Sequence, residues 1–117
     1  MAVGLVVDDS RSVRQWFRIA LEQLGHDVIE ARDGEEALNL YSQNSTDFVV
    51  TDIEMPGKTG LELIADLRRA NPSVKILAVS GMGGAVLQRS VELGAVSSLS
   101  KPCSLQEVRD AIQGLLA

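Results

Sequence analysis

The stretch Val3-Gly-Leu-Val-Val-Asp-Asp9 ends a nearly continuous apolar run with two acidic residues. Such a run is typical of a short strand that is covered on both faces. From Val13 to Leu24 the apolar side chains recur with the spacing of one helix face, and Gly25 supplies the residue type that commonly ends a helix. The sequence therefore predicts a strand and then a helix whose apolar face, Trp16 and Phe17 included, packs into the core.

The same alternation of strand and helix continues to the end of the chain. Strands are predicted at Val3–Val7, Asp27–Glu30, Asp47–Thr51, Val74–Val79 and Val96–Ser100. Helices are predicted to begin near Val13, Asp33, Thr59, Gly84 and Ser104, and three of these sites have the spacing of a capping box. Alternation of this kind requires a parallel sheet with helices on both faces. We therefore expect an α/β fold, a three-layer (βα)5 sandwich with a five-stranded parallel sheet, formed by residues 1–117 as a single domain.

Composition narrows the possible functions. The 117 residues carry 11 Lys and Arg against 16 Asp and Glu, and the net charge of −5 argues against sequence-independent binding to nucleic acid or to an anionic membrane. No apolar run is long enough to span a bilayer, and the first residues lack the layout of a secretory signal. The single cysteine, Cys103, is compatible with a reducing compartment. We expect a cytoplasmic domain.

Polar residues follow four of the predicted strands. Asp8 and Asp9 follow the first strand, Asp52 the third, Ser80 the fourth and Lys101 the fifth. Because the carboxyl ends of parallel strands share one edge of the sheet, we expect these side chains to converge there. Two carboxylates about 4 Å apart repel by roughly 4 kcal/mol at an effective dielectric near 20, so the cluster favours a bound proton or a divalent cation. An all-oxygen site suits Mg²⁺, and the remaining groups suit phosphoryl transfer to a carboxylate.

Four segments then identify a family that the chain resembles. In order and spacing they are similar to the signature blocks of the receiver domain of bacterial two-component response regulators, and they are Leu5–Asp9, Val50–Gly57, Ala78–Gly81 and Leu99–Pro102. The resemblance implies a CheY-like, flavodoxin-like sheet of strand order 2-1-3-4-5. It also implies a signalling domain, not an enzyme with a separate substrate. Such a domain accepts phosphate from a sensor histidine kinase or a histidine phosphotransfer protein, hydrolyses it slowly, and switches a surface read by a downstream protein or a fused output domain.

The resemblance assigns the metal site and the acceptor residue by residue. Asp52 matches the phosphoacceptor. Asp9 and Asp52 match direct ligands of Mg²⁺, for which Mn²⁺ could substitute, and the backbone carbonyl of Glu54 matches the third protein ligand. Asp8 matches the acid that acts mainly through a metal-bound water.

The resemblance also assigns the groups that bind the phosphoryl oxygens. Ser80 matches the hydroxyl that donates a hydrogen bond to the phosphoryl group, and Gly81 matches the small residue that leaves room for it. Lys101 matches the lysine that pairs with the phosphate. Pro102 is expected to follow a cis peptide bond.

Three positions depart from or vary within the family pattern. Ser98 stands where the family usually has an aromatic residue that turns inward on activation. We therefore expect activation to order the glycine-rich loop 81–84 and to shift the helix that follows it. Glu54 and Met82 occupy the two variable positions that flank the phosphoryl group, and the resemblance makes them the residues that tune its hydrolysis.

Two other classes of function stay open. A phosphohydrolase with an aspartyl-phosphate intermediate would use Glu54 as a general acid, but 117 residues leave little room for a cap and a substrate pocket. A pseudo-receiver would bind partners without phosphate, and the complete set of acids, hydroxyl and lysine argues against it. The chain is either a free-standing regulator or a receiver cut from a larger protein.

Other notable residues have ordinary explanations. His26 is expected in a turn at the sheet edge opposite the acids. Cys103 lacks a neighbouring base or second thiol and is expected to be unreactive. Arg11, Arg14 and Arg18 are expected on the outer side of the first helix, either as a solvated face or as a docking surface for a kinase.

Overall fold

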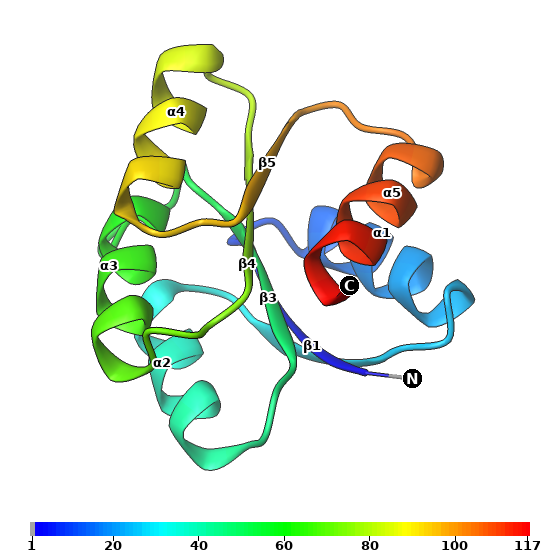
Figure 1. Ribbon diagram of the computed structural model, residues 1–117, viewed down its shortest axis with the longest axis horizontal. Coiled ribbons are helices and arrows are strands. Elements are labelled where there is room, and N and C mark those ends of the chain that lie inside the picture. The colour runs from blue at the N-terminus through cyan, green and yellow to red at the C-terminus, as the bar shows by residue number, and fades with distance from the viewer. Residues whose placement is uncertain (1) are drawn as a thin grey trace.

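The computed structural model describes residues 2–117 and contains one sheet of five parallel strands in the order β2-β1-β3-β4-β5 (Figure 1). The strands are β1 (Val3–Val7), β2 (Asp27–Ala31), β3 (Phe48–Asp52), β4 (Ile76–Ser80) and β5 (Ser97–Ser100). The helices are α1 (Arg11–Gln23), α2 (Gly34–Gln43), α3 (Gly60–Ala70), α4 (Gly84–Leu93) and α5 (Leu105–Leu116). The predicted fold class and strand order are confirmed.

The helices form two layers, one on each face of the sheet. In Figure 1, α1 and α5 lie together on one side of the strands, and α2, α3 and α4 lie on the other. Successive strand residues point to opposite faces, so each strand supplies both layers. In β1, for example, Leu5 and Val7 pack beneath α2 and α3, while Val6 packs beneath α1 and α5. This explains why β1, β3 and β4, the three inner strands of the sheet, have nearly continuous apolar sequences.

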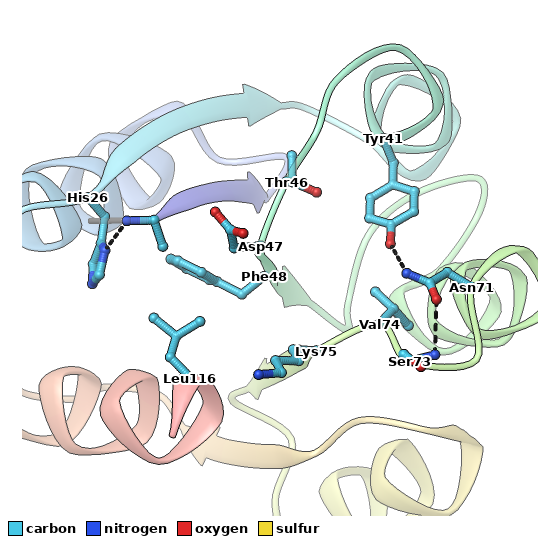
Figure 2. Close-up of a pocket in the computed structure, with 11 residues that line it drawn as sticks. His26, Tyr41, Thr46, Asp47, Phe48, Asn71, Ser73, Val74, Lys75 and Leu116 are labelled. Carbon is cyan, nitrogen blue, oxygen red and sulfur yellow. Dashed lines mark hydrogen bonds between the residues drawn. The ribbon is translucent and has the colours of Figure 1, made fainter.

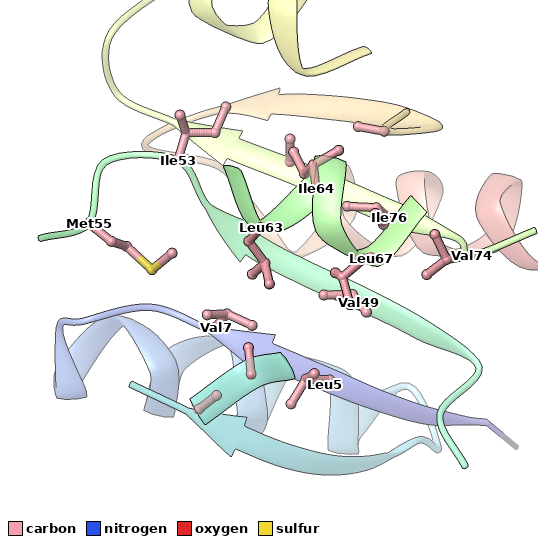
Figure 3. Packing of buried hydrophobic residues seen from close by; sticks show 14 of the residues in the cluster. Leu5, Val7, Val49, Ile53, Met55, Leu63, Ile64, Leu67, Val74 and Ile76 are labelled. Carbon is pink, nitrogen blue, oxygen red and sulfur yellow. The ribbon is translucent and has the colours of Figure 1, made fainter. Parts of the chain in front are cut away.

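The larger core lies under α2, α3 and α4. Its centre is formed by Leu63, Ile64 and Leu67 of α3 against Val49 and Ile76 of the sheet, and all five are fully buried (Figure 3). Truncating one such leucine to alanine costs about 2–5 kcal/mol. The strands that end in Asp52 and Ser80, β3 and β4, are buried along their whole length.

Helix starts follow the predicted capping pattern at two of three places. Reciprocal capping boxes join Thr59 with Glu62 and Ser104 with Glu107. At α2 the carboxylate of Asp33 accepts a hydrogen bond from the Glu36 backbone, as predicted, but the Glu36 side chain accepts from the backbone N–H of Arg32 instead. The box is therefore incomplete at α2, because Glu36 reaches one residue further back.

The prediction for the two adjacent aromatic residues of α1 was half wrong. Phe17 is buried, with 4% of its surface exposed, whereas Trp16 is 40% exposed and meets the Phe17 ring edge-on. The apolar stripe of α1 is wider than the face that reaches the sheet, which consists of Phe17, Ala20 and Leu21. Trp16 instead lines a groove of about 470 Å³ with Pro102. Over residues 2–117, no helix has both the length and the apolar character needed to cross a membrane.

Candidate functional site

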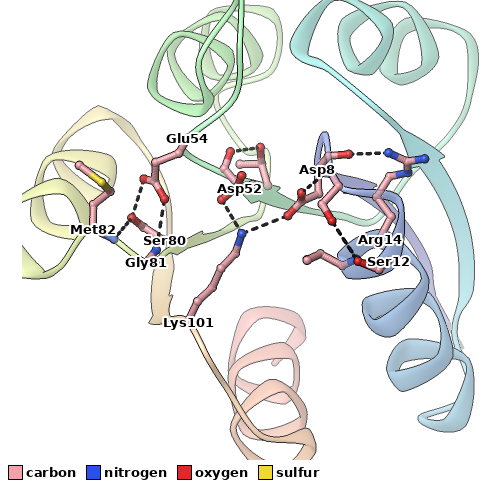
Figure 4. Close-up of polar contacts among 12 residues, drawn as sticks. Asp8, Ser12, Arg14, Asp52, Glu54, Ser80, Gly81, Met82 and Lys101 are labelled. Carbon is pink, nitrogen blue, oxygen red and sulfur yellow. Dashed lines mark hydrogen bonds and ion pairs between the residues drawn. The ribbon is translucent and has the colours of Figure 1, made fainter.

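The polar residues predicted to converge do so at the carboxyl edge of the sheet. Asp8 follows β1, Asp52 and Ser80 end β3 and β4, and Lys101 follows β5. The parallel register aligns these ends, since Asp52 lies beside Val79 in the neighbouring strand. Figure 4 shows Lys101 turned toward Asp52 and Asp8, with Ser80 beside them and turned toward Glu54. The fold therefore gathers groups that lie far apart in the sequence.

Three carboxylates form an acidic cluster at this edge. Oxygen atoms of Asp8, Asp9 and Asp52 all lie within 4.8 Å of one another. Asp8 and Asp52 are 2% and 4% exposed, while Asp9 is exposed to solvent. Hard oxygen donors with one side open to solvent fit Mg²⁺ better than a softer ion. These residues could hold such a cation.

Lys101 lies between the two buried acids and supplies their counter-charge. Its Nζ atom donates to Asp52 Oδ1 at 2.9 Å and to Asp8 Oδ2 at 3.2 Å (Figure 4). Burial raises the pKa of Asp52, and the charge of Asp8 adds to this, so that the pKa stays above its ordinary value despite the hydrogen bond from Lys101. Burial lowers the pKa of Lys101, but the hydrogen bond to Asp52 and the two negative charges outweigh it and raise that pKa.

Asp8 is held in place by backbone and arginine contacts. Its Oδ1 atom accepts from the backbone N–H of Ser10 at 2.8 Å, and its carbonyl accepts from Arg14 Nη1 at 2.7 Å. Arg14 also pairs with Glu30, and its side chain is only 16% exposed. The expectation of a solvated arginine face was therefore wrong for Arg14, which connects α1 to the start of the acidic loop. Arg18, also paired with Glu30, keeps 42% exposure.

A close approach of α3 fixes the backbone that carries Asp52. The backbone N–H of Gly60 donates to the Ile53 carbonyl at 2.9 Å. A Cβ atom at Gly60 would lie 2.2 Å from the carbonyl oxygen of Asp52, so that only glycine fits here. The hydroxyl of Thr51 donates to the same carbonyl at 2.9 Å. The Asp52 carboxylate thus stands on a backbone that is tightly packed.

The side chain of Glu54 makes contacts that sequence reasoning missed. Its carboxylate accepts from the Ser80 hydroxyl at 2.6 Å and from the Gly81 backbone N–H at 3.2 Å (Figure 4). The Ser80 oxygen in turn accepts from the Met82 backbone N–H at 3.0 Å. Spacing placed Glu54 near the site, but nothing in the sequence specifies which way a surface carboxylate points.

The remaining predicted residues surround this centre. The peptide bond between Lys101 and Pro102 is cis. The Met82 side chain is 68% exposed and shares an open groove with Glu54. Ser98 is half-buried in β5, where it lies beside Ala78 of β4.

His26 and Cys103 lie outside the acidic cluster. His26 is at the amino edge of the sheet, as predicted, where its Nδ1 atom accepts from the Ala2 backbone and its ring meets Phe48 edge-on. It lines an open cavity of about 540 Å³ there (Figure 2). Burial raises the pKa of the Cys103 thiol, and the nearby charge of Glu107 adds to the shift, which disfavours the reactive thiolate.

Comparisons with known proteins by family, sequence and structure agree with one another. The family model of the response regulator receiver domain matches residues 5–113. Sporulation initiation phosphotransferase F of Bacillus subtilis is 27% identical over 96% of this chain and 91% of its own length. The structure of the chemotaxis protein CheY4 of Vibrio cholerae matches with a TM-score of 0.93 and 31% identity, and 99% of each chain is covered.

Longer relatives match as well. Response regulator MprA of Mycobacterium sp. (strain KMS) is 39% identical over 96% of this chain, but the match covers only 49% of that protein. The chain spans about half the length of several curated relatives of this kind. The matches thus include both proteins of similar length and proteins with a further region.

Proposed function

The chain belongs to the response regulator receiver domain family, and on that premise we propose that it accepts a phosphoryl group on Asp52. The donor is a phosphohistidine on a sensor histidine kinase or on a histidine phosphotransfer protein. One observation carries this proposal. Two buried acids, the exposed Asp9, the ammonium of Lys101 and the hydroxyl of Ser80 meet at one edge of the sheet.

The transfer needs one bond made and one broken. A carboxylate oxygen of Asp52 attacks the phosphorus, an O–P bond forms, and the N–P bond to the donor histidine breaks. The imidazole leaves with that electron pair and takes up a proton from water. In slow hydrolysis a water oxygen attacks the phosphorus, the O–P bond breaks, Asp52 regains its carboxylate, and the water gives up its protons to solvent.

The chain's own groups stabilise the charge of the transferred group. Lys101 already contacts Asp52 at 2.9 Å and can follow the new phosphoryl oxygens as an ion-pair partner. The Ser80 hydroxyl and the Gly81 backbone N–H are the donors for a second oxygen. When bound, Mg²⁺ neutralises charge on the phosphoryl oxygens and on the acids. Asp9, Asp52 and the Glu54 carbonyl would hold it, and Asp8 would orient a water bound to it.

The biological context follows from the same premise. We propose that the domain works in the cytoplasm, that phosphorylation switches a surface read by a downstream protein or by a fused output domain, and that the domain itself binds neither nucleic acid nor membrane. Relatives of both lengths occur, so a free-standing protein and a part of a longer regulator both fit.

The experiment that tests the proposal is intact-protein mass spectrometry after incubation with Mg²⁺ and a small acyl phosphate. We expect one added phosphoryl group, which disappears when EDTA replaces Mg²⁺. Asp52→Asn, a near-isosteric control that removes the nucleophilic carboxylate, should add nothing.

Binding at the site can be tested separately from phosphoryl transfer. Beryllofluoride mimics a phosphoryl group and binds without a phosphate donor. Failure of the wild-type chain both to gain mass and to bind beryllofluoride would refute the phosphoacceptor role and leave the pseudo-receiver reading.

A further inference from the structure

The donors that would bind a phosphoryl oxygen are occupied by this chain's own Glu54. Its two carboxylate oxygens accept separately, one from the Ser80 hydroxyl at 2.6 Å and the other from the Gly81 backbone N–H at 3.2 Å (Figure 4). Ser80 is fully buried, so its hydroxyl needs a partner inside the fold. Glu54 itself is exposed and is reached from solvent.

Each of these donors serves one acceptor at a time. A hydroxyl and a backbone N–H carry one hydrogen each, and the Ser80 oxygen already accepts from the Met82 N–H at 3.0 Å. That third contact fixes the direction in which the Ser80 hydrogen points, which is toward Glu54. A phosphoryl oxygen and the Glu54 carboxylate therefore cannot use Ser80 and Gly81 together, and their negative charges repel each other.

We propose that the Glu54 carboxylate is a resident anion of the phosphoryl site, which it fills in the unphosphorylated domain and leaves when Asp52 is phosphorylated. The inference rests on the proposed function of Asp52. It differs from a role in hydrolysis, because it concerns the state before phosphate arrives. Glu54 thereby acts as a positioning residue that keeps the Ser80 and Gly81 donors oriented while it competes for them.

The exit path of Glu54 is open. Its side chain borders a groove of about 500 Å³ together with Met82 and Val86, the latter in the first turn of α4. A carboxylate that swings away from Ser80 enters this groove or solvent, so leaving adds no buried charge. Because the same exchange gives the Gly81 N–H, in the loop before α4, a new acceptor, displacement of Glu54 links the phosphoryl site to that helix.

The test measures how tightly the site binds beryllofluoride in Mg²⁺, followed by ¹⁹F NMR on wild type, Glu54→Ala and Glu54→Gln. Removing the competitor should tighten binding about tenfold in Glu54→Ala, the size expected for freeing donors from an exposed charged acceptor. Glu54→Gln, which keeps the shape but loses the charge, should fall between the two. The matched control is Glu35→Gln, which removes an exposed charge from the first turn of α2 without touching Ser80 or Gly81, and should leave binding within twofold of wild type.

A second readout follows the Gly81 amide by ¹⁵N–¹H NMR. Its proton should lie downfield in the unliganded wild type, move upfield in Glu54→Ala, and return downfield when beryllofluoride binds.

A purely structural role for Glu54 predicts the opposite change in affinity, namely weaker beryllofluoride binding in Glu54→Ala. Equal or weaker binding in that variant, with Asp52 still gaining phosphate, overturns the resident anion and spares the phosphoacceptor role. Loss of both the adduct and beryllofluoride binding in all the chains overturns both.

Discussion

Replacing Lys101 with methionine should expose how the acidic cluster is balanced. The change removes the ammonium but keeps most of the apolar stem, so packing changes little. In wild type that ammonium lies 2.9 Å from Asp52 and 3.2 Å from Asp8. Without it, three carboxylates within 4.8 Å of one another lose their counter-charge. We expect the folded state to be destabilised, and a divalent cation to restore most of the loss.

The size of the loss can be estimated from burial. Removing one partner of a buried ion pair costs about 3–5 kcal/mol. The Asp8 and Asp52 side chains are 3% and 4% exposed, but Lys101 is 27% exposed, so solvent already screens part of its charge. We therefore expect Lys101→Met to lower the free energy of unfolding by about 3 kcal/mol in EDTA at pH 8. A high pH is chosen so that the carboxylates do not relieve their mutual repulsion by taking up a proton. With Mg²⁺ present, the difference should fall to about 1 kcal/mol or less, the level of an exposed pair.

Chemical denaturation in EDTA and in saturating Mg²⁺ measures both numbers. The differences in unfolding free energy between variant and wild type, one in EDTA and one in Mg²⁺, form a thermodynamic cycle with Mg²⁺ binding. If Mg²⁺ stabilises the variant by about 2 kcal/mol more than it stabilises wild type, the variant must bind Mg²⁺ roughly 30-fold more tightly. A direct Mg²⁺ titration checks that figure independently. Arg18→Met is the matched control. It breaks an ion pair with Glu30 away from the cluster, and its cost should not depend on Mg²⁺.

Two results would refute this account of Lys101. An equal loss of stability in EDTA and in Mg²⁺ would mean that the lysine does not balance the charges that bind the cation. A variant as stable as wild type in EDTA would mean that the cluster relieves its own repulsion, for example by holding a proton on Asp52 even at pH 8.

Two further predictions concern the backbone under Asp52 and the arginine network. Gly60→Ala should destabilise the fold by about 2 kcal/mol in denaturant titrations, because its Cβ would lie 2.2 Å from a backbone oxygen. The control is Gly114→Ala in α5, where the added Cβ contacts nothing and should stabilise the fold by about 0.5–1 kcal/mol. Equal effects of the two substitutions would contradict the close approach at Gly60. Glu30→Gln should cost about 1 kcal/mol at pH 7. Hydrogen bonds from Arg18 and then Arg14 lower the pKa of Glu30, so its contribution is fully present above the ordinary value of 4.5 and is lost as pH falls through the lowered value in the folded protein. A gap in stability between Glu30→Gln and wild type that does not shrink as the pH is lowered from 7 would disprove this assignment.

The fold could be predicted because its main signal is repeated along the whole chain. The three central strands β1, β3 and β4 are apolar runs, every helix has an amphipathic stripe, and helix-ending residues such as Gly25 fall between the elements. The predicted and observed boundaries differ where apolar character extends past the hydrogen-bonded region. The predicted strand Val74–Val79 begins two residues before the observed β4, Ile76–Ser80, because Val74 is buried under the helices without pairing in the sheet.

Within the candidate site, placement could be predicted and side-chain direction could not. Parallel topology alone brings the carboxyl ends of β1, β3, β4 and β5 to one edge, which is why Asp8, Asp52, Ser80 and Lys101 meet there. The exposure of Trp16 and the partial burial of Arg14 depend on how α1 is rotated against the sheet, and the helical period does not determine that angle closely enough.

Glu54 shows both the predictable position of a residue and the unpredictable direction of its side chain. Its position after β3 follows from the sequence, and its carboxylate direction is visible only in the structure, where it meets Ser80 and Gly81. If the proposed function holds, an internal group occupies the place of a ligand with a charge of the same sign at two points of the sheet's carboxyl edge. Lys101 would stand in for a cation between the acids, and Glu54 would stand in for an anion at Ser80 and Gly81. Phosphorylation in the presence of Mg²⁺ would replace both at once, so the switch would exchange two internal contacts for two external ones and would not need an aromatic residue at Ser98.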